Sequence, residues 1–415
     1  MGWLRAKAMP RESQWPVTSL RPRPSLDFSL TGFVYGALML FMGFAAVQNR
    51  VNLLFGIFGL MIGILIVSGL ISRLVLRRLD VRRVYPEHGV VGRTMRAVYE
   101  ITNNKRYWPS LSVSLAELDG VDGFERQPQC YMLHAAAGMT ASVPADLVPK
   151  RRGLHELDRY ELGSGFPFGF IKRATVTRRT DRVLIYPAQA LVDQRLISMC
   201  RSAETTGATV RPEPGGTDEF YGVKDFRSGE NPRWIYWRRS ARTGALVSKE
   251  MTRVAPPRLL LVVDTFMSSH SSDAPELVER AIAMAGSLAS TALEQGMSVG
   301  LVAWGGHCWV VLPPARGKQQ RSELLSALAL LPANRQMILV NLMEQSHALV
   351  RPGVTPVLFT PQNLQLGLSE EARGGTLIVS SAIASARAWF SFEQNIDFRS
   401  CMPRQPDVVE QQAPN

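Results

Sequence analysis

Leu30–Val47 (LTGFVYGALMLFMGFAAV) and Leu53–Ile71 (LLFGIFGLMIGILIVSGLI) are the two stretches that decide how this chain folds. Neither contains a charged side chain, and each is close to the ~20 residues that a helix needs to cross a bilayer. The alternative, two helices buried in a soluble core, is less favoured because no charge interrupts either run. We predict a transmembrane hairpin over residues 30–72, with spans at 30–47 and 53–71.

The charges that flank these runs predict their orientation. Arginines precede the first run, and Arg73, Arg77 and Arg78 follow the second, whereas the connector holds only Arg50. Because Lys and Arg are enriched in cytoplasmic flanks, we expect an inner (cytoplasmic) membrane protein with both termini in the cytoplasm. The net charge of +12 fits an anionic leaflet, although it fits nucleic acid equally.

Residues 79–190 show the period of two that is typical of half-buried strands. In Met95–Ile101 and Leu111–Leu115, apolar residues alternate with mostly polar ones, and turn-type dipeptides separate such segments. This pattern predicts an antiparallel β-sandwich-like domain. The basic start of the chain, 1–29, and its polar tail, 403–415, are expected to be disordered.

From residue 258 the pattern changes to strands that alternate with helices. Leu259–Val263 is a continuous apolar run, as expected for a strand buried on both faces. Helical spacing follows over 275–295, and further strands and helices continue to about residue 400. This alternation predicts a doubly wound α/β domain over 258–400.

A stretch dense in charged and aromatic residues, 215–252, lies between these regions; we call it the signature stretch. It follows a loop predicted at 205–217 from its content of Gly, Pro and Thr. Guanidinium groups are buried only when they are paired, so this composition predicts a rigid charged surface. Indole faces would lie under guanidinium planes, and carboxylates would pair with arginines.

The signature stretch resembles that of the bacterial domain of unknown function 58 family. The matching residues are Arg227, Gly229, Arg233, Ile235, Trp237, Arg238, Ser240, Ala241, Arg242, Leu246, Lys249 and Glu250. Arg152-Gly153 and Pro167-Phe168-Gly169 resemble the β-region that precedes it in the same family. No reaction is attached to the family. The resemblance implies proteins that work alongside MoxR-type AAA+ ATPases in assembling or activating other proteins.

Nine positions of the signature stretch are our candidate site, either as a partner interface or as a structural signature. They are Arg227, Gly229, Arg233, Trp237, Arg238, Ser240, Arg242, Lys249 and Glu250. The two roles stay open at this point, because charged networks often serve only to hold domains together through internal ion pairs.

The end of the first α/β strand is the one candidate metal site. A strand ending in Asp264, then a serine-rich turn and a helix, resembles a von Willebrand factor A domain, whose Asp-x-Ser-x-Ser loop binds a divalent ion. Asp264 and Ser268 match the first and last ligand positions, but Phe266 at the middle position offers no oxygen. We therefore favour Asp264 as a helix cap or as the partner of a signature arginine, and expect no cofactor.

We favour a membrane-anchored, non-enzymatic protein-interaction platform that works with a MoxR-type AAA+ ATPase. One alternative is a hydrolase of unknown substrate, although the chain has no G-x-S-x-G elbow and its cysteines and histidines match no disulfide or zinc pattern. The other is a basic protein that binds nucleic acid through arginines and aromatic rings. Acidic residues are interleaved with the arginines of the signature stretch, so nucleic acid is not favoured.

Overall fold

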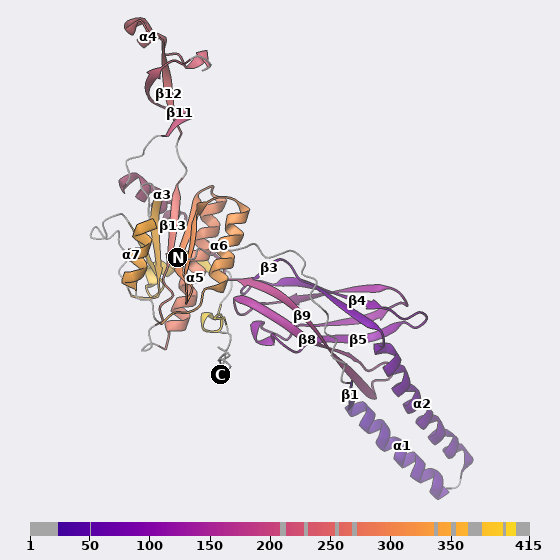
Figure 1. Ribbon diagram of the computed structural model, residues 1–415. Coiled ribbons are helices and arrows are strands. Elements are labelled where there is room, and N and C mark those ends of the chain that lie inside the picture. Colours follow the sequence, from indigo (N-terminus) through magenta and orange to yellow (C-terminus); the bar gives the residue numbers. More distant parts are fainter. Residues whose placement is uncertain are drawn as a thin grey trace, which may run out of the picture. The chain divides into compact units, whose positions relative to one another are not determined.

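The protein is seen here as a computed structural model that describes residues 24–49, 51–207, 213–227, 231–253, 257–267, 272–335, 339–349, 354–363, 376–392 and 396–403. It divides into two compact units (Figure 1). The strand-rich unit comprises Met1–Gly89, Arg93–Lys150 and Leu154–Ile185. The α/β unit comprises Val90–Gly92, Arg151–Gly153 and Tyr186–Asn415. Two short internal segments of the chain therefore belong to the α/β unit although their neighbours belong to the other.

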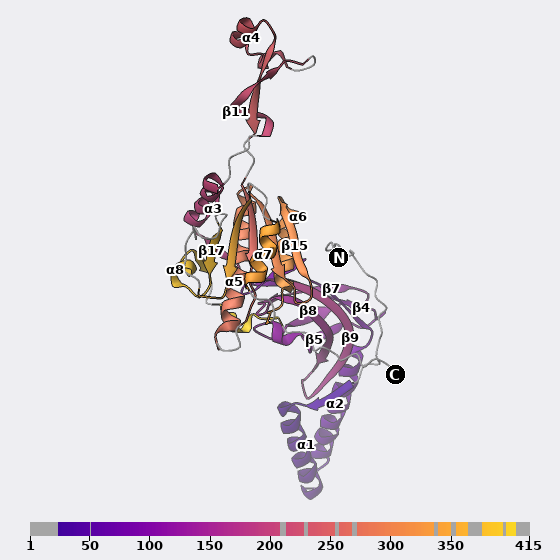
Figure 2. The same cartoon turned by 60° about the vertical axis from the view of Figure 1, so that its left-hand side comes forward.

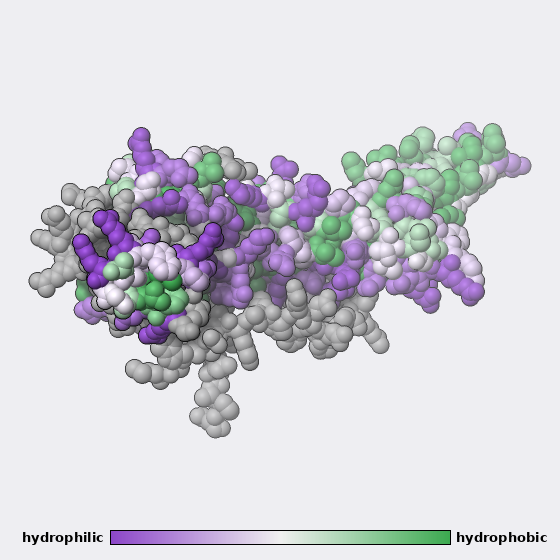
Figure 3. Space-filling model, turned by 90° about the horizontal axis from the view of Figure 1, so that it is seen from above, coloured by the Kyte–Doolittle hydropathy of each residue, from purple (hydrophilic) through white to green (hydrophobic). Residues whose placement is uncertain are grey.

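The strand-rich unit contains two apolar helices, as the sequence predicts: α1 (Leu30–Asn49) and α2 (Asn52–Leu76). Both are long and apolar enough to cross a membrane. They run side by side, and the Tyr35 hydroxyl donates a hydrogen bond to the carbonyl oxygen of Met61 at 3.1 Å. Most of their large apolar side chains are exposed, and they form the hydrophobic end of the surface at the right of Figure 3.

The rest of this unit consists of two antiparallel sheets, as predicted. The larger sheet has the order β1 (Pro24–Phe28), β9 (Ile171–Tyr186), β8 (Gly153–Ser164), β5 (Ser110–Glu117) and β6 (Gln129–Ala135), with β3 (His88–Val90) on β9. The smaller sheet joins β2 (Leu79–Val84), β4 (Met95–Asn103) and β7 (Thr140–Leu147). In β4, alternate side chains such as Tyr99 and Ile101 are buried. The expectation of disorder up to residue 29 is wrong for Pro24–Phe28, because this segment pairs with β9.

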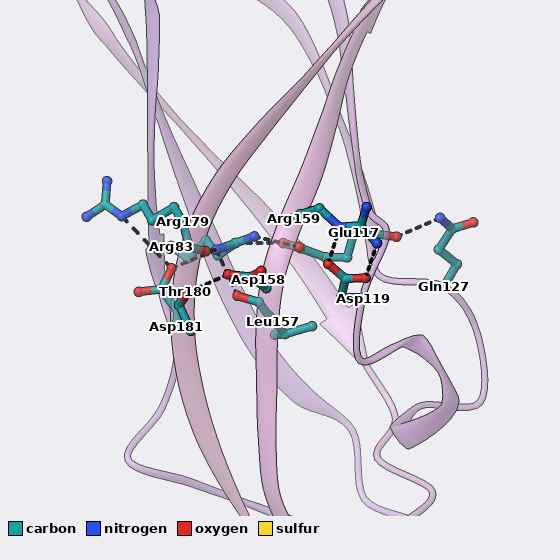
Figure 4. A network of polar contacts seen from close by, with 10 residues as sticks. All are labelled: Arg83, Glu117, Asp119, Gln127, Leu157, Asp158, Arg159, Arg179, Thr180 and Asp181. Carbon is teal, nitrogen blue, oxygen red and sulfur yellow. Dashed lines mark hydrogen bonds and ion pairs between the residues drawn. The ribbon is translucent and has the colours of Figure 1, made fainter. Parts of the chain in front are cut away.

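A buried charged network lies inside the strand-rich unit (Figure 4). The Arg83 guanidinium donates to both carboxylate oxygens of Glu117, at 2.8 and 2.7 Å, and to Asp181 at 2.8 Å. The side chains of Arg83 and Glu117 are fully buried. Burial raises the pKa of Glu117, while Arg83 opposes that rise. Each charge of this pair depends on the other, because removing one partner would leave the second charge buried without a counter-charge.

The α/β unit is built on a mixed sheet. Its order is β15 (Trp309–Ala315), β14 (Ser298–Trp304), β13 (Arg258–Val263), β16 (Val354–Thr360) and β17 (Leu377–Ser380), with β15 and β17 at opposite edges (Figure 2). The described pairs are parallel except that of β14 with β15, which a short turn joins. The predicted alternation of strands and helices is therefore confirmed.

Helices cover both faces of this sheet. Leu259, Leu261 and Val263 of β13 pack with α5 (Ala274–Glu294) and α6 (Lys318–Leu330). Leu260 and Val262 point the other way and pack with α7 (Leu339–Leu349). Burial on both faces explains why β13 reads as an unbroken apolar run.

The segment before the signature stretch differs from the prediction. Residues 205–207 end the helix α3 (Gln194–Gly207), and residues 213–217 begin the strand β11 (Glu213–Asp225). The predicted loop at 205–217 is therefore wrong at both ends, and residues 208–212 between them lie outside the described residues. The apolar positions of α3, Leu196, Ile197 and Cys200, are buried in the α/β core.

Candidate functional site

The signature stretch folds as a β-hairpin with two short helices between its strands; we call residues 213–253 the signature hairpin. Strand β11 pairs antiparallel with β12 (Val247–Arg253), and Val223 lies opposite Lys249. A 3₁₀ turn at Pro232–Trp234 and the helix α4 (Trp237–Thr243) lie in the connection that joins the two strands. The Asn231 side chain caps the 3₁₀ turn by accepting from the Arg233 backbone at 3.1 Å.

Ser240 holds α4 onto the hairpin. Its hydroxyl oxygen accepts a hydrogen bond from the Val247 backbone N–H at 2.9 Å, and the Tyr236 N–H donates to the Val247 carbonyl at 2.7 Å. Ile235 and Val247 are buried beside it. Gly244 ends the helix at φ 73°, in the left-handed conformation that favours glycine. Ser240 is itself buried, so among the candidate residues it has a structural role.

The cationic and aromatic candidates are instead on the surface. Trp237 is 65% exposed, and Arg227, Arg233, Arg238 and Arg242 are all exposed. Figure 3 shows an apolar area bordered by hydrophilic side chains at the end of this hairpin. Large exposed aromatic rings beside arginines are typical of protein-binding surfaces, where both residue types are enriched.

The internal pairing predicted for this stretch is not observed among the residues that the structure describes. None of the five arginines between 227 and 242 forms an ion pair with a described acidic side chain or lies over a described indole ring. The contact that does occur joins Lys249 to the Tyr236 ring, with Nζ 5.3 Å from the ring centroid. Gly229 and the side chain of Glu250 lie outside the described residues.

Asp264 directly follows β13, the central strand of the α/β sheet. The chain leaves β13 through α5 to β14 on one side and later returns to β16 on the other. The carboxyl end of β13 is therefore a topological switch point, the place where open α/β sheets commonly bind ligands. Thr360 ends β16 and Ser380 ends β17, so three polar side chains gather along this edge.

The Asp264 carboxylate is buried and hydrogen-bonded on both oxygens. Oδ1 accepts from the Phe266 backbone N–H at 2.9 Å, and Oδ2 accepts from the Thr360 hydroxyl at 2.8 Å and the Gln362 amide at 3.3 Å. Burial raises the pKa of Asp264, and these three hydrogen bonds oppose the rise. Our expectation of a helix cap or an arginine partner is wrong within the described chain, because Asp273 precedes α5 and these three donors surround Asp264.

These residues fit a divalent ion poorly. Such an ion needs several oxygen ligands, often including more than one carboxylate, whereas the described residues contain no group of three His, Cys, Asp or Glu that could hold a metal. Phe266 contributes only its backbone, and the lone pairs of Asp264 already accept three hydrogen bonds. Ser268, the second candidate ligand, lies outside the described residues.

Comparison with known proteins supports one family. Residues 222–373 match the family model described as "Protein of unknown function DUF58". The DUF58 match begins in β11 and covers α4, β12 and the α/β sheet as far as β16. It therefore includes Asp264 and the signature hairpin from Gly222 onward.

Other comparisons add little to the DUF58 match. A search of curated proteins found no match. Among solved structures, a β-glucosidase from Listeria innocua in complex with glucose and a second structure of that enzyme each share 13% identity, with a TM-score of 0.17. The similarity covers 26% of this chain and 16% of theirs, so the chain spans only a small part of those proteins.

A buried ion pair in the α/β unit was not predicted from the sequence, and the DUF58 match includes only one of its two residues. Arg152 Nη1 lies 2.9 Å from both carboxylate oxygens of Glu279, and Arg152 Nη2 donates to the Leu331 carbonyl at 2.5 Å. Glu279 is in the matched segment, but Arg152 precedes it by many residues. One signal was present: Glu279 stands beside Val278, Ile282 and other apolar residues of α5, where an acid needs a buried partner.

Proposed function

We propose that this protein is a membrane-anchored, non-enzymatic platform that binds another protein through its signature hairpin. The helices α1 and α2 would anchor it in a bacterial inner membrane. The arginines that flank them favour cytoplasmic termini and a cytoplasmic location for both units. The α/β unit would be a von Willebrand factor A-like domain, which the position of Asp264 at the end of the central strand supports.

The observation that carries this proposal is the exposed cationic and aromatic surface of the hairpin. Trp237 is 65% exposed, although burying such a ring would contribute strongly to stability. Ser240 and the paired strands hold the ring and its neighbouring arginines on a defined scaffold. A surface of this kind fits a partner that offers carboxylates and an apolar pocket.

The partner that we propose is a MoxR-type AAA+ ATPase, which the family resemblance implies. Its recognition by the hairpin would depend on Trp237 as the apolar anchor, with Arg238 and Arg242 as the charged contacts. Loss of a buried aromatic anchor typically costs about 2 kcal/mol or more of binding free energy, roughly thirtyfold in affinity.

The test is capture of the ATPase from intact membranes, using the full chain. Trp237→Ala should reduce the ATPase recovered at least tenfold, and Arg238→Glu with Arg242→Glu should abolish recovery. The matched control is Tyr131→Ala, which removes a similarly exposed ring from β6 in the strand-rich unit. Equal recovery of the ATPase with Trp237→Ala and with wild type would contradict the proposal. Binding of the wild-type chain to nucleic acid that these variants abolish would contradict it as well.

The proposed orientation in the membrane is tested by a separate measurement. A protease or impermeant label added outside intact cells should leave a tag at the carboxyl terminus untouched. A tag that is cleaved from outside would place both units on the other side of the membrane and remove the cytosolic ATPase from consideration.

A further inference from the structure

A buried lysine joins the end of α2 to the loop between β4 and β5 of the strand-rich unit. Lys105 Nζ donates to the carbonyl oxygens of Leu74 and Val75, at 3.0 and 2.7 Å, and to the Ser110 hydroxyl at 2.6 Å. Carbonyls of a last helical turn have no partners within the helix, and a cation there also interacts favourably with the helix dipole. The loop that follows Lys105 is therefore fixed against the end of the helix.

That end of α2 coincides with the expected membrane boundary. Counted from Asn52, about 20 residues at 1.5 Å each cross the ~30 Å hydrocarbon core, which reaches the neighbourhood of Ile71. The first charged side chain of α2 is Arg73, and the exposed Arg77 and Arg78 follow it. With the proposed membrane anchor, residues that contact Leu74 and Val75 would lie at the level of the lipid headgroups.

Exposed aromatic and apolar side chains occur in the loops at this level. Asn103 Nδ2 donates to the carbonyl oxygens of Trp108 and Ala136, at 3.0 and 3.1 Å, which brings the loops 104–109 and 136–139 together. In these loops Tyr107 is 74% exposed, Trp108 60% and Met139 62%. The Arg106 guanidinium lies over the Tyr107 ring, 5.1 Å from its centroid.

A third loop reaches the beginning of α1, at the same end of the helix pair. The Ser29 N–H donates to the Phe170 carbonyl at 3.2 Å, and the Tyr35 ring stacks on the Phe170 ring at 4.2 Å. Phe168, in the same loop, is 52% exposed and stacks on Phe170. Both helix ends on this side are therefore bordered by exposed aromatic rings of the strand-rich unit.

We infer that these loops form a lipid-binding surface that rests in the anionic headgroup layer of the membrane that α1 and α2 cross. This juxtamembrane surface consists of Arg106, Tyr107, Trp108, Met139 and Phe168. Tyr and Trp are enriched at membrane–water interfaces, since each ring has an apolar body and a polar tip. Arg106 and the arginines after α2 would contact lipid phosphates. The inference rests on the proposed membrane anchor and adds a second attachment to it.

The test places one fluorescent label at a time on the full chain in lipid vesicles. Cys308 is the exposed cysteine of the part described, and the other three are buried, so Cys308→Ser gives a background for single labels. The positions are Tyr107→Cys in the proposed surface, Leu60→Cys within α2, and Arg126→Cys as the matched control. Arg126 is exposed in the loop between β5 and β6, at the ends of these strands opposite Ser110.

The expected result separates the surface from the anchor. With phosphatidylglycerol vesicles, a quencher in the headgroup region should reduce emission at position 107, a quencher deep in the acyl chains should reduce emission at position 60, and neither should affect position 126. If the label at position 107 is quenched no more than the label at position 126, while the label at position 60 is quenched, the lipid-binding surface is overturned and the membrane anchor is not. Absence of quenching at position 60 would overturn the membrane anchor and the surface with it.

The lipid charge gives a second readout. Replacing phosphatidylglycerol by phosphatidylcholine should diminish quenching at position 107 and leave position 60 unchanged. Quenching at 107 that does not depend on lipid charge would contradict the contribution assigned to Arg106 and the arginines after α2.

Discussion

Arg152 and Glu279 face each other inside the α/β unit, with one guanidinium nitrogen 2.9 Å from both carboxylate oxygens. Both side chains are almost completely buried. Arg152 comes from a three-residue segment, Arg151–Gly153, that lies far in sequence from the rest of its unit. Its backbone N–H also donates to the carbonyl of Cys401 at 3.1 Å, so this segment contacts both α5 and the residue that follows the 3₁₀ turn Phe398–Ser400.

Removing either partner alone should destabilise the α/β unit strongly. Arg152→Met leaves a buried carboxylate without its cation, at a cost of about 3–5 kcal/mol. The double variant Arg152→Met with Glu279→Met should be more stable than either single variant, because no charge stays buried. Urea unfolding of the detergent-solubilised chain measures these differences. Arg321→Met, which breaks the exposed pair with Glu294, is the control and should cost roughly 0–1 kcal/mol. Additive losses in the double variant would contradict this account.

The same pair predicts a dependence of stability on pH. Burial raises the pKa of Glu279 from 4.5 to about 7, although Arg152 opposes the rise. A carboxyl that binds its proton more tightly in the folded state contributes stability below about pH 4.5 and loses that contribution as the pH rises to about 7. The melting temperature of wild type, relative to that of Glu279→Gln, should therefore fall between pH 4.5 and 7. If the melting temperatures of wild type and Glu279→Gln change with pH in parallel, Glu279 is ruled out as the titrating group.

Asp264 should respond to substitution as a hydrogen-bond acceptor. Asp264→Leu leaves the Phe266 N–H, the Thr360 hydroxyl and the Gln362 amide without their acceptor, so it should cost about 1–3 kcal/mol for each donor that stays unpaired. Asp264→Asn keeps one oxygen and removes a buried charge, so its loss should be smaller. The measurement is the unfolding free energy of the α/β unit.

A related measurement concerns divalent ions. Since the Asp264 oxygens already accept hydrogen bonds, Mg²⁺ or Mn²⁺ should leave the melting temperature of the wild-type chain unchanged. A clear rise in the melting temperature that Asp264→Asn abolishes would identify an ion site and refute the expectation of no cofactor.

Ser240 should be needed for the shape of the signature hairpin. Ser240→Ala leaves the buried Val247 N–H without an acceptor, which should cost about 1–3 kcal/mol and loosen α4. Trypsin cleavage after Arg238, Arg239 and Arg242 should then become faster, because cleavage follows local opening. Thr243→Ala also removes a hydroxyl from α4, but an exposed one, and should leave the cleavage rate near that of wild type. Equal rates for both variants would count against a specific role of Ser240.

Lys105 should stabilise the junction between α2 and the strands. Lys105→Met removes the donor for the carbonyls of Leu74 and Val75, so amide hydrogen exchange in the last turn of α2 should accelerate. Burial lowers the pKa of Lys105 to about 8, so the amine remains mostly protonated at pH 7. The control is Lys150→Met, at an exposed lysine in another loop. Unchanged amide exchange in Lys105→Met would mean that the hydrogen bonds from Lys105 to Leu74 and Val75 do not stabilise the end of α2.

The elements whose sequence pattern repeats were predictable. The uncharged runs predict α1 and α2, and the alternation in Met95–Ile101 predicts β4, because each pattern reflects which face of one element avoids water. The unbroken run of Leu259–Val263 likewise predicts a strand covered on both faces. α2 extends to Leu76, five residues beyond the predicted end at Ile71, because Arg73 does not interrupt helical geometry; the helix ends at Arg77, whose backbone is extended.

The elements that depend on partners distant in sequence were not predictable. Pro24–Phe28 becomes a strand only because β9 offers it an edge, and its own composition favours disorder. Asp264 accepts a hydrogen bond from Thr360 at the end of β16, almost a hundred residues away, and Arg152 pairs with Glu279 at a greater separation. In the signature hairpin the composition identified the exposed residues Trp237 and Arg238, but the buried role of Ser240 required the strand pairing.

The assembly of the α/β unit from three separate segments limits how the chain can be divided. A fragment that begins at Tyr186 would contain the whole sheet and the complete DUF58 match, yet it would lack Arg152 and keep Glu279. Proteolytic or recombinant pieces cut at the apparent border should therefore aggregate or melt early, unless Glu279 is replaced as well. During synthesis on the ribosome, Arg152 would likewise have to wait for α5 to emerge before its charge could be neutralised.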